Sequence, residues 1–167
     1  MPFEGENISL PSMKYTLRPL TAADEPLLWE MLYQGVQPKE GNPPAPSREI
    51  VHQPQLARYV EGWGRSGDTG FVAHDVEQGQ LLGAVWLRRP ADQPQPGAPL
   101  ELAFAVKPGQ RGRGIGTALL TQLVRANPEA SAITISSVAG HPVLRLYERF
   151  GFKAVEQKPN AIVMRRE

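Results

Sequence analysis

The stretch LELAFAVKPGQRGRGIGTALLTQLV, residues 100–124, contains the clearest secondary-structure pattern in this chain. Its first seven residues are mostly apolar and favour a strand, and its last ten carry apolar residues at helical spacing. Between them Gly112, Gly114 and Gly116 stand at alternate positions. Glycine adopts backbone conformations closed to other residues and lets a ligand approach the main chain closely. The sequence therefore predicts a strand over residues 100–106, a glycine-rich turn, and a helix over residues 114–126.

The turn has the composition of a phosphate-binding site. Because it opens a helix, unpaired N–H groups and the positive end of the helix dipole converge there, and Arg111 and Arg113 add charge. The dinucleotide fingerprint G-x-G-x-x-G does not fit the spacing of residues 112–116. A P-loop needs a lysine and a Ser/Thr directly after its last glycine, where this chain has Thr117 and Ala118. On glycine spacing alone, an ordinary helix start with solvated arginines is an equal alternative.

The run VKPGQRGRGIGTALL, residues 106–120, resembles motif A of the GNAT N-acetyltransferase superfamily, Arg/Gln-x-x-Gly-x-Gly/Ala between a strand and a helix. The resemblance implies an α+β, acyl-CoA N-acyltransferase fold: a mixed, mainly antiparallel twisted sheet with helices on both faces. It also implies that the turn holds the pyrophosphate of acetyl-CoA, which serves as co-substrate. The residues that take this role by resemblance are Arg111, Gly112, Arg113, Gly114, Ile115, Gly116 and Thr117.

Residues 141–152, HPVLRLYERFGF, resemble motif B of the same family, a short helix with Leu-Tyr followed by a Gly-Phe turn. The family commonly has asparagine where this chain has His141, so a hydrogen bond to the cofactor and a wetted helix start are both open for that residue. By resemblance Tyr147 points at the CoA sulfur and protonates the departing thiolate, which suits a phenol. The alternative is a tyrosine whose ring packs in the core and whose hydroxyl is solvated.

Attack of an amine on a thioester needs a neutral amine, a polarised carbonyl and a stabilised sulfur. The resemblance assigns the polarising main-chain N–H groups to a splayed strand around Phe104, Ala105 and Val106. Glu101 begins this strand, and alternation places it on one face with alanines. We expect it to be a lone, partly desolvated carboxylate and the candidate general base, because several family members place a glutamate there. The alternative is a solvated residue at the strand's exposed end.

The rest of the chain reads as one continuous series of elements. Thr21 and Asp24 indicate a helix cap before a first helix. Residues 1–13 are expected to form a loose extension and residues 14–167 a single domain. Proline-rich loops are expected over residues 36–48 and 90–99. The other predicted strands span residues 15–20, 69–75, 81–89, 132–138, 152–157 and 161–165, and the other predicted helices span residues 54–62 and 142–150.

Composition excludes several classes of function. The chain has no cysteine, which rules out disulfides, thiolate nucleophiles and cysteine-based zinc sites, and no metal is expected. A net charge of +1 opposes nucleic-acid binding. No segment approaches the roughly 20 apolar residues of a membrane span, and no secretory signal is visible, so we expect a cytoplasmic protein without a membrane partner.

The function predicted from the sequence is transfer of acetyl from acetyl-CoA to a primary amine, on a small molecule or a peptide, by direct attack in a ternary complex. The alternative from another class is a catalytically silent acyl-CoA-binding module with a regulatory or assembly role. The sequence leaves the acceptor unnamed and leaves a homodimer open.

Overall fold

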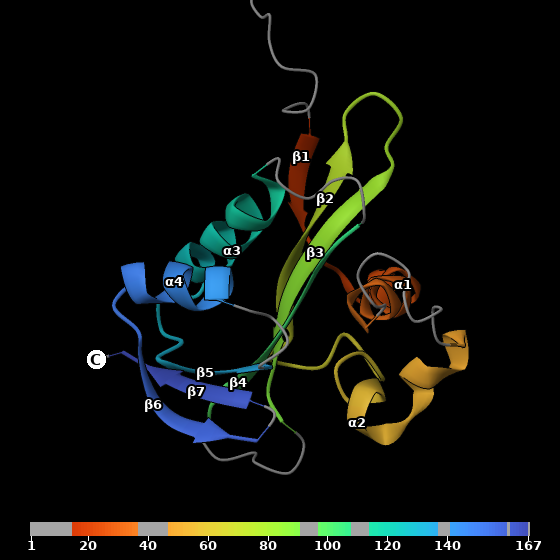
Figure 1. Ribbon diagram of the computed structural model, residues 1–167. Coiled ribbons are helices and arrows are strands. Elements are labelled where there is room, and N and C mark those ends of the chain that lie inside the picture. Colours follow the sequence, from red (N-terminus) through yellow and green to blue (C-terminus); the bar gives the residue numbers. More distant parts are fainter. Residues whose placement is uncertain are drawn as a thin grey trace, which may run out of the picture.

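The computed structural model describes residues 15–36, 47–90, 97–107, 114–136, 141–159 and 161–166. They form a twisted seven-stranded sheet with helices packed on it (Figure 1). The strands, in the sheet order β1-β2-β3-β4-β5-β7-β6, are β1 (Tyr15–Pro19), β2 (Thr69–Asp75), β3 (Leu81–Arg88), β4 (Leu100–Val106), β5 (Ala132–Ser136), β7 (Ala161–Arg165) and β6 (Lys153–Lys158). The helices are α1 (Glu25–Val36), α2 (Pro54–Ala57), α3 (Ile115–Ala126) and α4 (His141–Arg149), with 3₁₀ turns η2 (Ala22–Asp24) and η4 (Arg48–His52).

The sheet is mixed and mainly antiparallel, as predicted. Every neighbouring pair of strands runs antiparallel except β4 and β5, which are parallel. The strands predicted over residues 69–75 and 81–89 form the hairpin of β2 and β3, and the turn that joins them carries Gly79 with a φ of 68°. At one edge, β6 is exposed along its whole length and its register with β7 shifts between Ala154 and Glu156.

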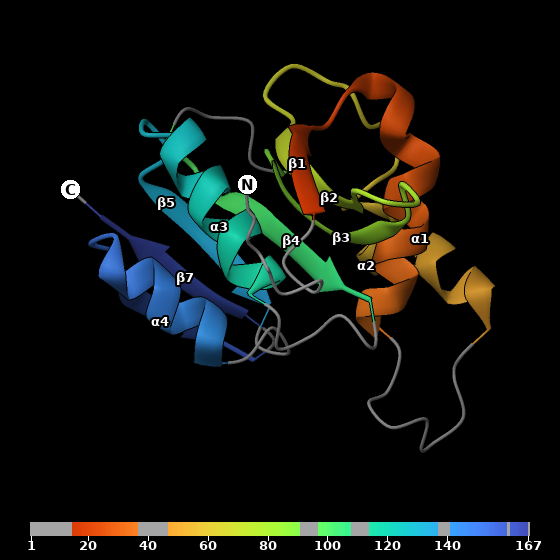
Figure 2. The same cartoon turned by 90° about the horizontal axis from the view of Figure 1, so that it is seen from above.

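Helices cover both faces of the sheet: α3 and α4 lie on one, α1 and α2 on the other (Figures 1 and 2). Alternation along β4 divides its side chains between two separate apolar clusters, as expected from the sequence. Leu102 and Phe104 pack with α3 and α4, whereas Ala103 and Ala105 pack with α1. On the expectations drawn from the sequence, we call the first side the cofactor face and the second the acceptor face.

The first helix begins as its sequence predicts. The backbone N–H of Thr21 donates to the Asp24 carboxylate at 2.7 Å, and Arg18 pairs with the same carboxylate at 2.9 Å. The hydrogen bond from Arg18 holds the pKa of Asp24 below its usual value, against the opposing effect of burial. This cap closes a 3₁₀ turn, and α1 follows from Glu25.

The second helix is shorter than predicted. It was expected over residues 54–62 but ends at Ala57, and the chain continues in turns. The cause lies on β3, where the buried Arg88 donates from Nη1 to the Glu61 carbonyl at 2.8 Å and the Arg58 carbonyl at 3.3 Å. Its Nε pairs with Asp68 at 3.0 Å, and the two side chains are only 1% and 4% exposed. Gly62, with a φ of 72°, also ends helical continuation.

No helix in the described ranges is both long and apolar enough to cross a lipid bilayer.

Candidate functional site

The described pairing of β4 with β5 is shorter than its pairing with β3. It runs from Leu100↔Ile133 to Leu102↔Ile135, whereas pairing with β3 continues to Val106↔Gly83. In this register the positions opposite Phe104 to Val106 fall within residues 137–140, which lie outside the described residues. The splay of β4 from β5 therefore stays a prediction.

The direction of the N–H groups on this segment follows from one hydrogen bond. The N–H of Lys107 donates to the Leu82 carbonyl on β3 at 2.9 Å. Because N–H groups alternate along a strand, those of Phe104 and Val106 point to the opposite edge, toward β5, and that of Ala105 points to β3. Two of the three predicted positions thus direct an N–H group toward the β5 side of β4.

The glycine turn reaches α3 through a left-handed residue. Gly114 is the N-cap, with φ 80° and ψ 0°, and a Cβ built on it meets no heavy atom within 4 Å. The first bond of the helix runs from the Ala118 N–H to the Gly114 carbonyl, at 3.0 Å. The N–H groups of Ile115, Gly116 and Thr117 precede that bond, at the positive end of the helix. Unpaired N–H groups at a helix start are the donors that a phosphate site uses.

Gly116 couples this turn to β4. A Cβ on Gly116 would lie 2.9 Å from Cζ of the Phe104 ring, closer than real contacts allow. Its neighbours differ: Ile115 is buried in the core and contributes only backbone to the turn, while the side chain of Thr117 is exposed. Because Gly116 has no side chain, the start of α3 can pack directly against Phe104 on β4. Arg111, Gly112 and Arg113 lie outside the described residues, as does the side chain of His141 at the start of α4.

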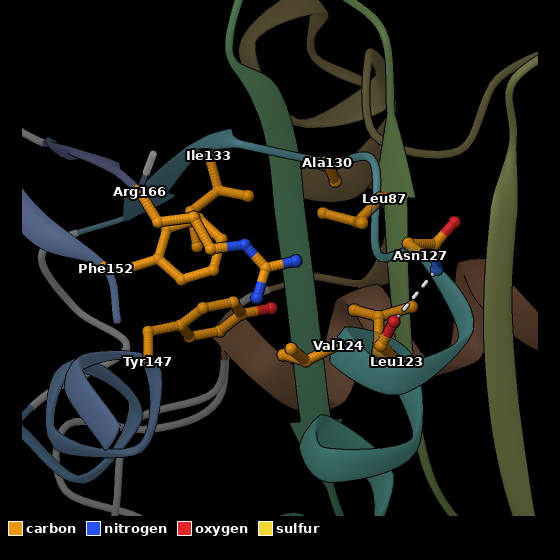
Figure 3. Close-up of a pocket in the computed structure, with 9 residues that line it drawn as sticks. All are labelled: Leu87, Leu123, Val124, Asn127, Ala130, Ile133, Tyr147, Phe152 and Arg166. Carbon is orange, nitrogen blue, oxygen red and sulfur yellow. Dashed lines mark hydrogen bonds between the residues drawn. The ribbon is translucent and has the colours of Figure 1, made fainter. Parts of the chain in front are cut away.

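Tyr147 projects from α4 into the core of the cofactor face (Figure 3). It is 1% exposed, and its ring meets that of Phe152 edge-on, with centroids 5.2 Å apart. Within the described part of the chain, its hydroxyl has no hydrogen-bond partner. Burial raises the pKa of Tyr147 well above its usual value, and the charge of Arg166 opposes this. The phenol therefore stays protonated and is a proton donor that lacks an acceptor.

The hydroxyl is enclosed, which contradicts the alternative of a solvated hydroxyl, while the role at the CoA sulfur stays a prediction. Tyr147 shares a small pocket with Leu87, Ile133 and Arg166, next to the C-terminal end of α3. Since Leu87 pairs with Leu102, and Ile133 with Leu100, this pocket lies over the paired part of β4 and β5.

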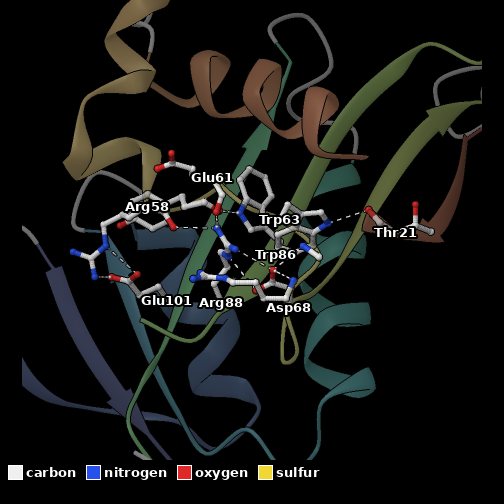
Figure 4. A network of polar contacts seen from close by, with 11 residues as sticks. Thr21, Arg58, Glu61, Trp63, Asp68, Trp86, Arg88 and Glu101 are labelled. Atoms are coloured by element: carbon white, nitrogen blue, oxygen red, sulfur yellow. Dashed lines mark hydrogen bonds and ion pairs between the residues drawn. The ribbon is translucent and has the colours of Figure 1, made fainter. Parts of the chain in front are cut away.

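Glu101 lies on the acceptor face and is not the lone carboxylate that the sequence suggested (Figure 4). Arg58 grips it with two nitrogens: Nη2 is 2.6 Å from Oε2 and Nε is 3.2 Å from Oε1. The Glu101 side chain is 12% exposed and the Arg58 side chain is 42% exposed. The expectation of a lone carboxylate was wrong, because the turn after α2, held by Arg88, brings Arg58 over β4.

Arg58 is a residue of this face that sequence reasoning missed, and Tyr59 follows it in the chain. Burial, and then the charge of Glu101, raise the pKa of Tyr59. Arg58 and Glu101 are 43 positions apart and belong to no shared motif. No pattern in the sequence signals their pairing.

The candidate site therefore has two sides. On one lie the glycine turn, the N–H groups of Phe104 and Val106, and the enclosed hydroxyl of Tyr147. On the other lies Glu101 with Arg58. The candidate acid and the candidate base do not meet, since the sheet lies between them.

Comparison with known proteins agrees with this architecture. The family model described as Acetyltransferase (GNAT) domain matches residues 66–154, just over half of the chain. A mycothiol acetyltransferase from Mycobacteroides abscessus is 36% identical over 86 residues, which are 49% of this chain and 28% of that protein. The chain thus spans less than a third of the length of this curated relative.

Solved structures with the same fold cover nearly the whole chain. A GCN5-related N-acetyltransferase from Kribbella flavida has a TM-score of 0.54 at 25% identity, covering 91% of this chain and 96% of that one. A phosphinothricin acetyltransferase from Sinorhizobium meliloti, solved with acetyl-CoA, has a TM-score of 0.55 at 22% identity, covering 92% and 88%. The family match over residues 66–154, on a sheet of this topology, shows that the chain belongs to the GNAT acetyltransferase family.

Proposed function

We propose that this protein is an N-acetyltransferase that moves the acetyl group of acetyl-CoA to a primary amine by direct attack within a ternary complex. The observation that carries the proposal is Gly114. It is left-handed, caps α3 and faces open space, at the helix end where amides and dipole favour an anion. A side chain at this position would enter the space that a phosphate needs.

The chain has suitable groups for each part of the cofactor. The amides of Ile115, Gly116 and Thr117, with Arg111, Gly112 and Arg113, would hold the pyrophosphate, and His141 is a further candidate contact. The N–H groups of Phe104 and Val106 would bind carbonyl oxygens on the β5 side of β4. When bound, acetyl-CoA supplies an activated thioester. The phosphinothricin acetyltransferase solved with acetyl-CoA supports this assignment by its shared fold.

Direct transfer forms a bond between the amine nitrogen and the acetyl carbon and breaks the carbon–sulfur bond. It needs a base for the amine proton and an acid for the thiolate. Glu101 is the candidate base, and Tyr147, whose phenol is protonated and lacks an acceptor, is the candidate acid. Their positions on opposite faces suit an amine that arrives on one side of the sheet and a thiol that leaves on the other.

A specific observation also favours the second candidate, a catalytically silent acyl-CoA-binding module. The Tyr147 hydroxyl is enclosed and Glu101 is paired with Arg58, so neither side chain is exposed in this structure. Catalysis requires both to become accessible to the reacting groups. A silent module requires only the glycine turn.

Calorimetric titration with acetyl-CoA, combined with thiol release over a panel of amines, polyamines, aminoglycosides, amino acids and peptides, separates the two. Binding with turnover supports the enzyme. Binding without turnover for any acceptor supports the module. Absence of binding contradicts both.

A further inference from the structure

The ion pair between Arg58 and Glu101 lies where the acceptor must approach, on the face of β4 opposite the cofactor face. Arg58 is the outer partner, at 42% exposure, and Glu101 is the inner one, at 12%. A molecule that reaches Glu101 from solvent therefore meets the guanidinium first. An acceptor that carries only an ammonium group would meet a positive charge at the entrance to its own binding site.

The pair is held in place by the interior of the protein. The Arg58 carbonyl accepts from the buried Arg88, and the neighbouring Tyr59 carbonyl accepts from Nε1 of Trp86 at 2.8 Å. Arg88 itself is fixed by Asp68, whose carboxylate also accepts the backbone N–H groups of Gly64 and Arg65 at 2.9 Å. Many surface ion pairs lie on loops without such hydrogen bonds and contribute little to stability. The backbone that carries Arg58 is instead fixed by buried side chains, as the backbone of a recognition site must be.

The geometry of the pair matches a zwitterion. Its donor and acceptor atoms are 2.6 and 3.2 Å apart, so a cation and an anion stand side by side. An α-amino acid presents the complementary arrangement, an ammonium and a carboxylate separated by two bonds of about 1.46 and 1.52 Å. Its carboxylate fits the planar fork of an arginine, and its ammonium fits a carboxylate. When an amino acid binds, the single pair of Arg58 and Glu101 is replaced by two pairs, one of each side chain with the amino acid, and the net charge of the site is unchanged. A simple amine would add one positive charge.

Resting on the proposed function, we propose that the acceptor is an amino acid, or another small molecule with a carboxylate beside its primary amine, with its carboxylate on Arg58 and its amino group at Glu101. Loss of a proton to Glu101 leaves the amine neutral for attack on the acetyl carbon. The bond that forms is nitrogen to carbon, and the bond that breaks is carbon to sulfur.

The test compares each of the twenty L-amino acids with its own carboxamide, which keeps the amine and removes the negative charge. Steady-state thiol release with acetyl-CoA gives kcat/KM for each member of a pair. For the best amino acid we expect a preference over its amide of about 10- to 100-fold, the worth of a hydrogen bond to a charged group. Arg58→Gln should bring that ratio close to one, mainly through KM, and Arg58→Lys should restore part of it.

The control is a second arginine–glutamate pair on this face. Nη1 of Arg48 is also 2.6 Å from Oε1 of Glu30, but this pair joins η4 to α1. The Arg48 side chain is 65% exposed and the Glu30 side chain is 30% exposed. Arg48→Gln should leave the preference for the amino acid unchanged. A merely structural Arg58 would lower both rates equally and leave the ratio unchanged, which would overturn the proposal.

Acetylation of polyamines or peptides but of no amino acid would also overturn it, while leaving the N-acetyltransferase function in place. Binding of acetyl-CoA without turnover of any acceptor overturns both this inference and the N-acetyltransferase function, and supports the silent module. If acetyl-CoA does not bind at all, the proposed function fails, and this inference fails with it.

Discussion

The two faces of the sheet are held together by different forces. The cofactor face is an apolar cluster around α3 and α4, in which the Tyr147 hydroxyl finds no partner among the described residues. The acceptor face carries the ion pairs Arg18–Asp24, Arg48–Glu30, Arg58–Glu101 and Arg88–Asp68. Apolar packing does not depend on pH or salt in the way that exposed charges do. The half proposed to bind a constant cofactor is therefore the half less sensitive to conditions, and the half proposed to select the acceptor is the more sensitive one.

The largest expected effect is on the cofactor face. Gly114→Val should weaken acetyl-CoA binding by at least roughly 100-fold, since the side chain blocks charge-assisted hydrogen bonds from the turn. The left-handed backbone also costs valine about 1–2 kcal/mol of stability. Calorimetry measures the first effect and thermal unfolding the second.

Gly79→Val is the matched control for this change. Gly79 is also left-handed, with a φ of 68°, and its Cβ also meets nothing within 4 Å, but it lies in the β2–β3 turn. It should show the same loss of stability with normal affinity. Equal affinity in both variants would place the phosphate site elsewhere.

Tyr147→Phe should separate catalysis from packing on the same face. Turnover should fall by roughly 10²-fold if the phenol is a general acid of ordinary strength, with acetyl-CoA affinity retained. The free energy of unfolding should rise by about 1 kcal/mol, because a buried hydroxyl without a partner is removed. Kinetics and urea unfolding on one preparation measure both. Unchanged turnover would leave Tyr147 a packing residue, and a parallel loss of affinity would mean that its hydroxyl only orients the cofactor.

Glu101→Gln tests the acceptor face. Cofactor binding should persist, while turnover at neutral pH should fall by at least about tenfold and recover in part at higher pH, where more of the amine is already neutral. Glu30→Gln, which breaks the pair with Arg48, should leave the rate–pH profile unaltered. If Glu101→Gln also keeps the wild-type profile, water or an amine of low pKa replaces the proposed base.

The smallest effect concerns the cap of α1. Since the pKa of Asp24 is lowered in the folded protein, its ionisation stabilises the fold fully above the unfolded value of about 3.9, and this contribution is lost as pH falls through the lower folded value. Asp24→Asn should therefore cost about 1 kcal/mol at pH 7 and progressively less below pH 4. Urea unfolding across that range measures the difference. A cost that does not vary with pH would show that the charge of Asp24 is unimportant.

The sequence predicts the cofactor face better than the acceptor face, for a physical reason. The strand, turn and helix of residues 100–126 are contiguous, so periodicity and glycine spacing describe them locally. The alternation of Leu102 and Phe104 against Ala103 and Ala105 is likewise a local property, and it is confirmed. The environment of Glu101 and the end of α2 depend instead on Arg58 and Arg88, which come from distant parts of the chain. No local pattern records such pairings.

Other expectations stay predictions. The loose extension over residues 1–13 and the roles of Arg111, Gly112, Arg113 and the His141 side chain fall outside the described residues. The expected loop over residues 36–48 is described only at its ends, where Arg48 already belongs to η4.

The buried pair of Arg88 and Asp68 limits how this protein can change over evolutionary time. Loss of either partner alone would leave an uncompensated charge inside the protein, at a cost of about 3–5 kcal/mol, a large share of the 5–15 kcal/mol that stabilises a typical domain. The two positions are therefore expected to be inherited together. Arg58 is under less constraint, because its side chain is 42% exposed and it is not the candidate base. Descendants of this sequence can acquire a new acceptor through a change at Arg58, while Glu101 and the buried pair of Arg88 and Asp68 are kept.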